Sequence, residues 1–205
     1  MEPKNKVSMI ILAAGISQRF NGNKLLVEID GVPLVRKTVE IYLKTDPYEI
    51  FVIVGHEQEK IKSALKGLNV KFVFNENFKE GQSSSVIKGI LSTNKNSDGY
   101  LFGLADQPFV SNELIKKIIN SFYIRKKGET LIAAPFIEGK RGNPVLFSAS
   151  LRKKLLKIIG DKGAREIYKH IQDKYPLAIE KVNIPEEMAF YDFDTEDDFK
   201  KFLSN

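Results

Sequence analysis

Short apolar segments alternate with helix-like segments over the first two thirds of the chain, and this alternation restricts the fold more than any other feature. The apolar segments are nearly continuous and rich in valine, isoleucine and phenylalanine, as expected for strands that are buried on both faces. They cover residues 7–14, 49–55, 70–75, 100–106 and 130–137. Strands that alternate with helices predict right-handed βαβ units, and therefore an α/β fold with a mostly parallel sheet and helices on both faces.

Two segments between these strands have the periodicity of helices. Residues 111–127 place apolar side chains on one face at the spacing of helical turns, and Ser111 or Asn112 is a suitable N-cap. Residues 34–44 follow Gly-Val-Pro and predict a second helix. No linker rich in proline, glycine or serine interrupts the sequence, so we expect residues 1–205 to form a single domain.

The regular alternation of strand-like and helix-like segments ends after residue 137. Glycines cluster in GKRGNP (139–144) and in GDKG (160–163). Strand-like segments follow at 177–184 and 189–194, and residues 195–203 predict a short final helix. We therefore expect an irregular second half attached to the regular βαβ part.

The charge balance indicates anionic partners, because the net charge of the chain is +6. The basic residues are spread out, and Arg-Lys-Lys at 125–127 is too short for a nucleic-acid arm, so we expect no nucleic-acid partner. The absence of cysteine excludes disulfides, cysteine-based zinc sites and cysteine nucleophiles. The polar start of the chain and the lack of a long apolar run predict a cytoplasmic location without membrane contact.

The segment LAAGISQRFNGNK (12–24) directly follows the first predicted strand, where open parallel sheets bind ligands. Small residues expose backbone N–H groups that bind phosphate, a hydroxyl adds a donor, and arginine and lysine match phosphate oxygens. The candidate residues for a nucleoside triphosphate are Ala13, Ala14, Gly15, Ser17, Arg19 and Lys24. The alternative is a tight turn with surface cations. The motifs of P-loop NTPases and of dinucleotide-binding oxidoreductases are absent here, which argues against both classes.

Three aspartates are candidate magnesium ligands. Asp106 ends the strand-like segment YLFGLADQP, and Mg²⁺ prefers one or two carboxylates together with phosphate oxygens. Asp192 and Asp194 lie two residues apart on one side of a predicted strand, so this pair is a candidate to complete the site. The alternatives are a turn or helix cap at Asp106 and an N-cap at Asp194.

Three further segments carry polar side chains on turn-like sequence. EGQSSS (80–85) places Gln82 and three successive hydroxyls at a predicted helix start, for which the alternative is a serine-rich cap. GKRGNP and GDKGAR offer cations and an amide, for which the alternative is exposed turns. The residues in question are Ser83, Ser84, Ser85, Arg141, Asn143, Lys162 and Arg165. The two histidines, His56 and His170, are predicted to be a turn residue and a helix-surface residue.

These segments occur together and in one order: L-A-A-G-x-S-x-R, a lysine, E-G-x-S-S-S, A-D-Q-P, R-G-N-P-V-L-F, G-D-x-G-A-R and D-x-D-T. In this the chain resembles the MobA-like nucleotidyltransferases, and most closely the molybdenum cofactor cytidylyltransferases (MocA-like), over about residues 8–199. Two positions depart from the family pattern: Asn21 stands before Gly22 where glycine is usual, and the last motif reads T-E-D-D where T-P-E-D is commoner.

The resemblance implies a Rossmann-like nucleotidyltransferase fold and a Mg²⁺-dependent transfer of CMP from CTP to the terminal phosphate of molybdopterin, with release of pyrophosphate. It implies that the first motif (Leu12, Ala13, Ala14, Gly15, Arg19 and Lys24) binds the triphosphate and that Asp106 binds Mg²⁺ with help from Asp192 or Asp194. It places Ser83, Ser84 and Ser85 near the nucleoside, and Arg141, Asn143, Lys162 and Arg165 toward the acceptor.

The same resemblance divides the domain into a mainly nucleotide-binding half (1–110) and a mainly acceptor-binding half (111–205). Ala14 distinguishes it from guanylyl-transferring relatives, which typically read L-A-G-G. A molybdenum-dependent oxidoreductase that receives the product is a further implied partner. Two other functions stay open: nucleotidyl transfer to another phosphorylated acceptor, such as a sugar phosphate or a phosphoalcohol, and a non-catalytic carrier or chaperone of finished molybdenum cofactor.

Overall fold

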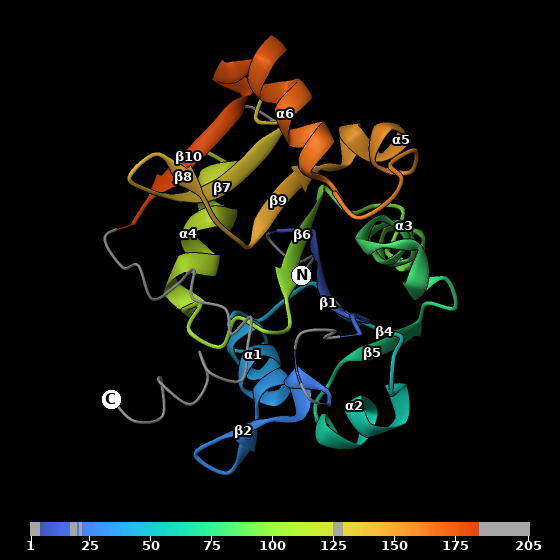
Figure 1. Cartoon of the computed structure of the whole chain (residues 1–205). Helices are drawn as coiled ribbons and strands as arrows, with labels where there is room; N and C mark the ends of the chain where they lie inside the picture. Colours follow the sequence, from blue (N-terminus) through green and yellow to red (C-terminus); the bar gives the residue numbers. More distant parts are fainter. Residues whose placement is uncertain (1–4, 17–19, 21, 125–128, 185–205) are drawn as a thin grey trace.

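A twisted sheet with helices on both sides forms the centre of the molecule (Figure 1). The computed structural model describes residues 5–16, 20, 22–124 and 129–184. Within these residues the large sheet contains β1 (Val7–Ala13), β4 (Glu49–Val54), β5 (Lys71–Phe74), β6 (Gly99–Leu104), β7 (Ile132–Ile137), β8 (Lys140–Arg141), β9 (Val145–Ser148) and β10 (Ile179–Asn183). A small hairpin consists of β2 (Glu28–Ile29) and β3 (Val32–Pro33). The five predicted apolar segments each contain one strand.

The strand order is β10-β7-β9-β6-β1-β4-β5, with β8 paired to β7. The pairs β1–β4, β1–β6, β4–β5 and β7–β10 are parallel, whereas β9 runs antiparallel to both β6 and β7. This confirms the α/β fold with a mostly parallel sheet. The chain passes from β1 to β4 and β5 on one side and returns to place β6 on the other side of β1. Such a reversal of strand order opens a crevice at the carboxyl ends of the two strands.

Helices cover both faces of this sheet (Figure 1). They are α1 (Leu34–Leu43), α2 (Gln58–Ala64), α3 (Gln82–Ser92), α4 (Asn112–Phe122), α5 (Arg152–Leu155) and α6 (Arg165–Lys174). The side chains of α1, α2 and α4 pack into one core cluster, and those of α3, α5 and α6 pack into the other. Alternate residues of β1 supply the two clusters, since Met9 and Ile11 face the first and Ile10 faces the second.

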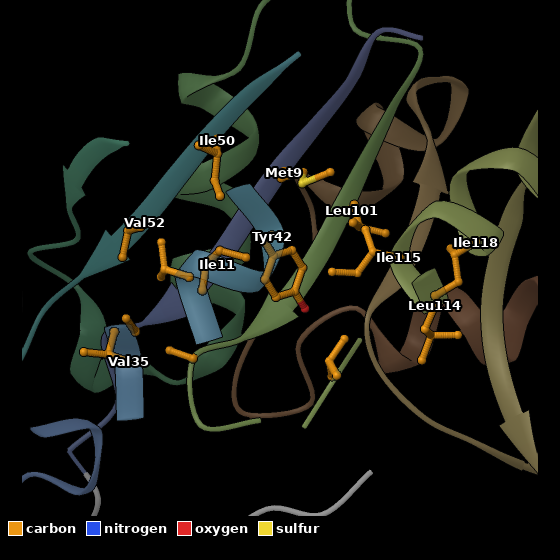
Figure 2. Close-up of a cluster of buried hydrophobic side chains, with 14 of the residues drawn as sticks. Met9, Ile11, Val35, Tyr42, Ile50, Val52, Leu101, Leu114, Ile115 and Ile118 are labelled. Carbon is orange, nitrogen blue, oxygen red and sulfur yellow. The ribbon is translucent and has the colours of Figure 1, made fainter. Parts of the chain in front are cut away.

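Figure 2 shows the first core cluster, in which Tyr42 of α1 lies fully buried among aliphatic side chains of β1, β6 and α4. The hydroxyl of Tyr42 reaches the end of β6, where a Cβ atom at Gly103 would lie 2.2 Å from Tyr42 Oη. Glycine at this position therefore lets the tyrosine ring pack directly under the strand that carries Asp106.

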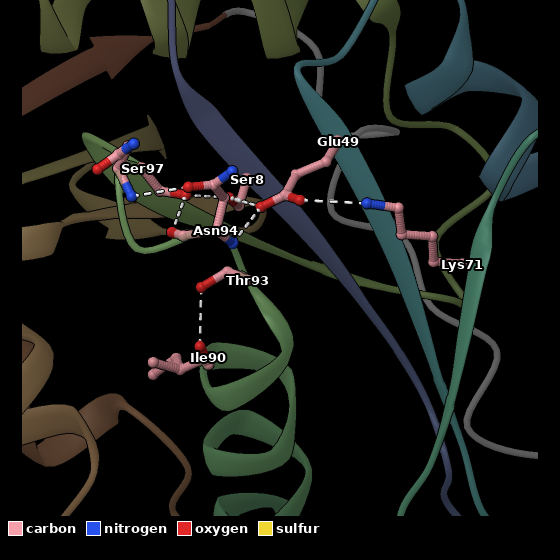
Figure 3. Close-up of polar contacts among 8 residues, drawn as sticks. Ser8, Glu49, Lys71, Ile90, Thr93, Asn94 and Ser97 are labelled. Carbon is pink, nitrogen blue, oxygen red and sulfur yellow. Dashed lines mark hydrogen bonds and ion pairs between the residues drawn. The ribbon is translucent and has the colours of Figure 1, made fainter.

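A polar network joins the amino ends of the central strands, at the opposite edge of the sheet from the crevice (Figure 3). The Glu49 carboxylate lies 2.6 Å from the hydroxyl of the fully buried Ser8, accepts a hydrogen bond of 2.8 Å from Asn94 N, and lies 3.4 Å from Lys71 Nζ. Ser8 Oγ is also 2.6 Å from Ser97 Oγ. Since a buried hydroxyl needs a partner, this network explains how serine is accommodated in a core strand.

Two details differ from the sequence-based expectation, and one prediction is not tested. The helix predicted over 111–127 begins with Ser111 as its N-cap and ends at Phe122, because the apolar stripe ends there. The glycine-rich segment 139–144 contains the short strand β8 instead of being only a loop. The strand and helix predicted for 189–203 lie outside the described residues.

Candidate active site

The turn after β1 opens onto the crevice between β1 and β6. Ala13 ends the strand, Ala14 is buried, and Gly15 is exposed with no atom within 4 Å of the position where a Cβ would stand. The carbonyl of Ala14 accepts a hydrogen bond of 3.4 Å from His56 N, which ties the turn to the end of β4. The turn therefore offers open backbone at its tip, as the small residues predicted.

Lys24 and Asp106 form an ion pair on the wall of the crevice. Lys24 begins the 3₁₀ helix η1 (Lys24–Leu26), and its Nζ lies 2.7 Å from Oδ2 of Asp106, which follows β6. The end of β6 is fixed to β1 because Ala105 N donates a hydrogen bond of 3.1 Å to Leu12 O. The two side chains are only 13% and 21% exposed, so the pair is less screened by water than a surface ion pair. The predicted phosphate-binding cation and the predicted metal ligand thus meet at one place.

The crevice has a volume of about 540 Å³. Its lining combines the turn after β1, the ion pair and the segment around the start of α3. The lining residues are Leu12, Ala13, Ala14, Gly15, Ile16, Lys24, Leu25, Phe78, Lys79, Gly81, Gln82, Ser85, Leu104, Asp106 and Asp161. We call this space the nucleotide cavity. Ser17 and Arg19, also predicted to bind the triphosphate, lie outside the described residues.

The three predicted serines lie in the first turn of α3, where they make hydrogen bonds within the protein. Ser83 Oγ donates to Gly160 O, and Ser84 Oγ donates to Gly81 O over 2.8 Å. Asn75 Nδ2, after β5, donates to Ser84 Oγ at 2.8 Å and Ser85 Oγ at 2.9 Å. Of the three, Ser85 lines the nucleotide cavity. These hydroxyls brace the start of α3, and Asn75 is a supporting residue that the sequence motifs did not single out.

The loop 160–163 lies against the start of α3. Ser83 N donates a hydrogen bond of 3.1 Å to Gly160 O. Gly81 has a φ of +100°, and a Cβ there would lie 2.4 Å from Asp161 Oδ1. This close contact brings Asp161 into the lining of the nucleotide cavity, a position that the sequence alone did not indicate.

A second, smaller pocket of about 60 Å³ adjoins the first and shares Leu12, Gln82 and Leu104 with it. Three predicted acceptor-binding residues line this pocket: Arg141, Asn143 and Arg165. The fourth, Lys162, is not among its lining residues. Lys162 is exposed, and its Nζ lies 3.4 Å from Glu166 Oε1.

Arg141 is the partly buried cation of this second pocket. Its Cζ lies 4.7 Å from the centre of the Tyr168 ring, and its guanidinium donates a long hydrogen bond of 3.4 Å to Gly142 O. Among the described residues, no carboxylate forms an ion pair with it. Burial lowers the pKa of Arg141, and the positive charge of Arg165 acts in the same direction. A partly buried cation of this kind is suited to an anionic ligand.

Of the three aspartates predicted as metal ligands, only Asp106 lies among the described residues. Asp106 lines the nucleotide cavity, whereas Asp192 and Asp194 lie outside the described residues. In the part of the chain that the structure describes, no three histidine, cysteine, aspartate or glutamate side chains gather as a metal-binding group. Over the same residues no helix is long and apolar enough to span a membrane.

The family model of the MobA-like NTP transferase domain matches residues 9–175. This chain belongs to that family. All the lining residues of both pockets fall within the matched range, so the MobA-like domain contains both pockets. The chain carries a nucleotidyltransferase domain.

Among curated proteins, the bifunctional protein GlmU of Francisella tularensis subsp. novicida (strain U112) is 27% identical over 172 residues. The match covers 82% of this chain and 36% of GlmU, so the chain spans about a third of the length of the curated relatives it matches.

Solved structures share the fold over nearly the whole chain. Rv0371c from Mycobacterium tuberculosis H37Rv has a TM-score of 0.82 at 20% identity and covers 99% of this chain and 100% of its own. Its complex with manganese has a TM-score of 0.77 at 20% identity, with 98% and 100% covered. A CMP:2-keto-3-deoxy-manno-octonic acid synthetase complexed with CTP has a TM-score of 0.75 at 12% identity, with 98% of each chain covered. These likenesses establish the nucleotidyltransferase fold.

Proposed function

We propose that this protein is a divalent-metal-dependent cytidylyltransferase that moves CMP from CTP to the terminal phosphate of molybdopterin and releases pyrophosphate. The observation that carries the proposal is the pair of adjoining pockets. One has an open backbone turn and the Lys24–Asp106 pair, and the other has Arg141 and Arg165. Transfer between two anionic substrates needs two such sites with a common wall, and Leu12, Gln82 and Leu104 form that wall.

In the nucleotide cavity, we expect the triphosphate at the turn after β1 and the nucleoside near the start of α3. Open backbone N–H groups at Gly15 and the cation of Lys24 suit phosphate oxygens. Phe78, Gln82 and Ser85 provide an aromatic ring, an amide and a hydroxyl, which suit a base and a ribose. The L-A-A-G motif and the CTP bound by one protein of the same fold support cytidine as the nucleoside.

A divalent metal fits the residues at Asp106. Its carboxylate is partly exposed, lines the cavity and lies beside the expected triphosphate, and Mg²⁺ accepts one carboxylate with phosphate oxygens and water. The manganese complex of one protein with this fold is consistent with such a metal. The metal, when bound, would neutralise charge that develops on the phosphate oxygens.

The chemistry needs no nucleophilic side chain, because the acceptor phosphate oxygen attacks the α-phosphorus of CTP and pyrophosphate leaves. The protein contributes position and charge. Lys24 and the open turn hold the triphosphate, and Arg141 and Arg165 hold the acceptor phosphate in the adjoining pocket. Catalysis then consists of orientation and of electrostatic stabilisation of the transferring group.

Molybdopterin as the acceptor is supported by the R-G-N-P and G-D-x-G-A-R segments, which place Arg141 and Arg165 in the second pocket. A molybdenum-dependent oxidoreductase would then receive the product. The likeness to a synthetase named for a sugar acid supports keeping a second candidate, because a protein of this fold is named for a compound other than molybdopterin. In that candidate the same site transfers a nucleotidyl group to a sugar phosphate or a phosphoalcohol.

A pyrophosphate-release assay with a panel of acceptors tests the proposal. The protein is mixed with CTP, GTP or ATP and with molybdopterin, a sugar phosphate or no acceptor, in the presence of Mg²⁺. We expect release only when CTP and molybdopterin are both present. Release with a sugar phosphate alone would favour the second candidate. Tight binding of finished cofactor without pyrophosphate release would instead indicate a carrier or chaperone.

A further inference from the structure

Asp161 is the acidic residue at the end of the nucleotide cavity near the start of α3, where we expect the nucleoside. It belongs to the loop 160–163, and its side chain lines the cavity beside Gly81 and Gln82. In the part of the chain that the structure describes, its carboxylate has no hydrogen-bond or ion-pair partner. A carboxylate that faces a ligand cavity without a partner has its acceptor oxygens free for that ligand.

Contacts with α3 hold the backbone of the loop on both sides of Asp161. Both the backbone N–H and the hydroxyl of Ser83 donate to Gly160 O, directly before Asp161. On the other side of Asp161, a Cβ at Gly163 would lie 2.5 Å from Gln82 Oε1, so this glycine lets the loop approach α3 closely. The backbone of Asp161 is therefore fixed beside the cavity before a nucleotide binds.

The other charges of the cavity decide which part of a nucleotide Asp161 meets. The open turn and Lys24 stand at the ends of β1 and β6, whereas Asp161 stands at the start of α3. Lys24 neutralises the Asp106 carboxylate at its end of the cavity, whereas the Asp161 carboxylate, unpaired among the described residues, repels phosphate, so the phosphates belong to the end with Lys24. Lys79, the cation near the start of α3, has its Nζ 6.0 Å from the centre of the Phe78 ring and forms no ion pair with Asp161. Asp161 thus faces the nucleoside, to which it offers only acceptor atoms.

We propose that Asp161 accepts a hydrogen bond from the exocyclic amino group of the base and thereby selects cytosine over uracil. This inference rests on the proposed function, in which CTP is the substrate. Uracil has a carbonyl oxygen where cytosine has the amino group. Uracil would therefore place this oxygen, a hydrogen-bond acceptor, against the Asp161 carboxylate, which also only accepts. A site that rejects a ligand by leaving polar groups unpaired discriminates more strongly than one that rejects it by size.

The substitution Asp161→Asn tests this assignment because the amide has the same shape and can donate a hydrogen bond to the uracil oxygen. The matched control is Asp173→Asn, which removes one exposed carboxylate from α6 away from both pockets. Equilibrium binding of CTP, UTP and dCTP is measured with Mg²⁺ for the wild-type protein and both variants. We expect the wild-type preference for CTP over UTP to fall by about tenfold or more in Asp161→Asn and to persist in the control.

The possible outcomes separate this inference from the function on which it rests. An equal loss of CTP and UTP affinity in Asp161→Asn would overturn the inference, because it would assign Asp161 to loop support. A loss of CTP affinity with unchanged dCTP affinity would also overturn it, because the carboxylate would then bind the ribose. A wild-type protein that binds no nucleoside triphosphate would contradict the proposed function, and the inference with it.

Discussion

Lys24 and Asp106 are joined by an ion pair of 2.7 Å between η1 and the end of β6, 82 residues apart in sequence. The pair places a cation and a carboxylate side by side on the wall of the nucleotide cavity. In the absence of a nucleotide, each group neutralises the other. We expect phosphate oxygens to replace Asp106 as the partner of Lys24 and to leave the carboxylate available for a divalent metal.

Replacement of Asp106 should therefore affect catalysis much more than folding. We predict that Asp106→Asn lowers kcat by about a hundredfold or more, the scale for loss of one electrostatic contact to developing charge. The melting temperature should stay near the wild-type value, because hydrogen bonding to β1 and packing on Tyr42 hold the backbone. Turnover and melting temperature are measured on one preparation across a Mg²⁺ titration.

Asp30→Asn is the matched control, because Asp30 forms an exposed ion pair of 2.6 Å with Lys37 outside the cavity. The control should keep wild-type turnover. An Asp106→Asn protein that is destabilised but active would show that the aspartate is a structural cap, which typically contributes about 1 kcal/mol to stability.

The second prediction concerns the acceptor pocket. Arg165→Ala should raise the apparent KM for molybdopterin and leave CTP binding nearly unchanged, because Arg165 lines the second pocket. Lys162→Ala should act in the same direction but more weakly, since Lys162 is exposed and paired with Glu166. Steady-state kinetics with each substrate varied in turn gives both KM values, with the exposed Lys174 at the end of α6 as the control position. Loss of CTP binding in Arg165→Ala would contradict the acceptor role.

The third prediction concerns the choice between CTP and GTP. A Cβ at Gly55 would lie 2.9 Å from the Ala14 Cβ and 2.7 Å from the Phe78 Cβ, so both side chains pack against Gly55, and both residues line the cavity. We expect wild-type protein to bind CTP more tightly than GTP, and Ala14→Gly to narrow this preference because it gives the larger base more room. Competition binding with Mg²⁺ measures the ratio. Equal or tighter binding of GTP by the wild type would overturn the cytidylyl assignment and leave the transferase class intact.

The fourth prediction concerns the polar network at the opposite edge of the sheet. Glu49→Ala removes the acceptor of Ser8 Oγ and Asn94 N, and it leaves the buried Ser8 dependent on Ser97 alone (Figure 3). Loss of buried hydrogen-bond partners typically costs about 1–3 kcal/mol of unfolding free energy. Chemical denaturation should show a loss on this scale, whereas kcat should not change. A fall in kcat under conditions where the variant is fully folded would contradict this prediction, because it would connect the network to the active site.

Much of the fold was predictable from local sequence. The central strands are continuous apolar segments, and α4 carries an apolar stripe that ends where the helix ends, at Phe122. The sequence also predicted at which edge of the sheet the cavity lies, because ligands bind beyond the carboxyl ends of parallel strands. The small residues at Ala13–Gly15 and the carboxylate of Asp106, which the sequence proposes as ligand-binding positions, lie on the wall of this cavity.

The remaining features depend on contacts between distant segments. The sequence predicted Lys24 and Asp106 as separate ligands of phosphate and metal, but it contains no signal that they pair across 82 residues. Likewise, Asp161 enters the nucleotide cavity because Gly81, at a φ of +100°, leaves room for it beside α3. From the motif G-D-x-G-A-R, the sequence predicted the cations Lys162 and Arg165 as candidate ligands, and it did not predict the carboxylate of Asp161 as one. Only the packing of the loop 160–163 against Gly81 brings the Asp161 carboxylate into the cavity lining.

The most direct test of the central claim is the mass of the product that forms from CTP and molybdopterin in the presence of Mg²⁺. CTP labelled at the α-phosphate follows the transferred group, and CTP labelled at the γ-phosphate follows the leaving group. The account predicts a product heavier than molybdopterin by one cytidylyl group, with the α-label in the product and the γ-label in pyrophosphate. An unchanged acceptor, or an acceptor that carries the γ-label, would contradict it.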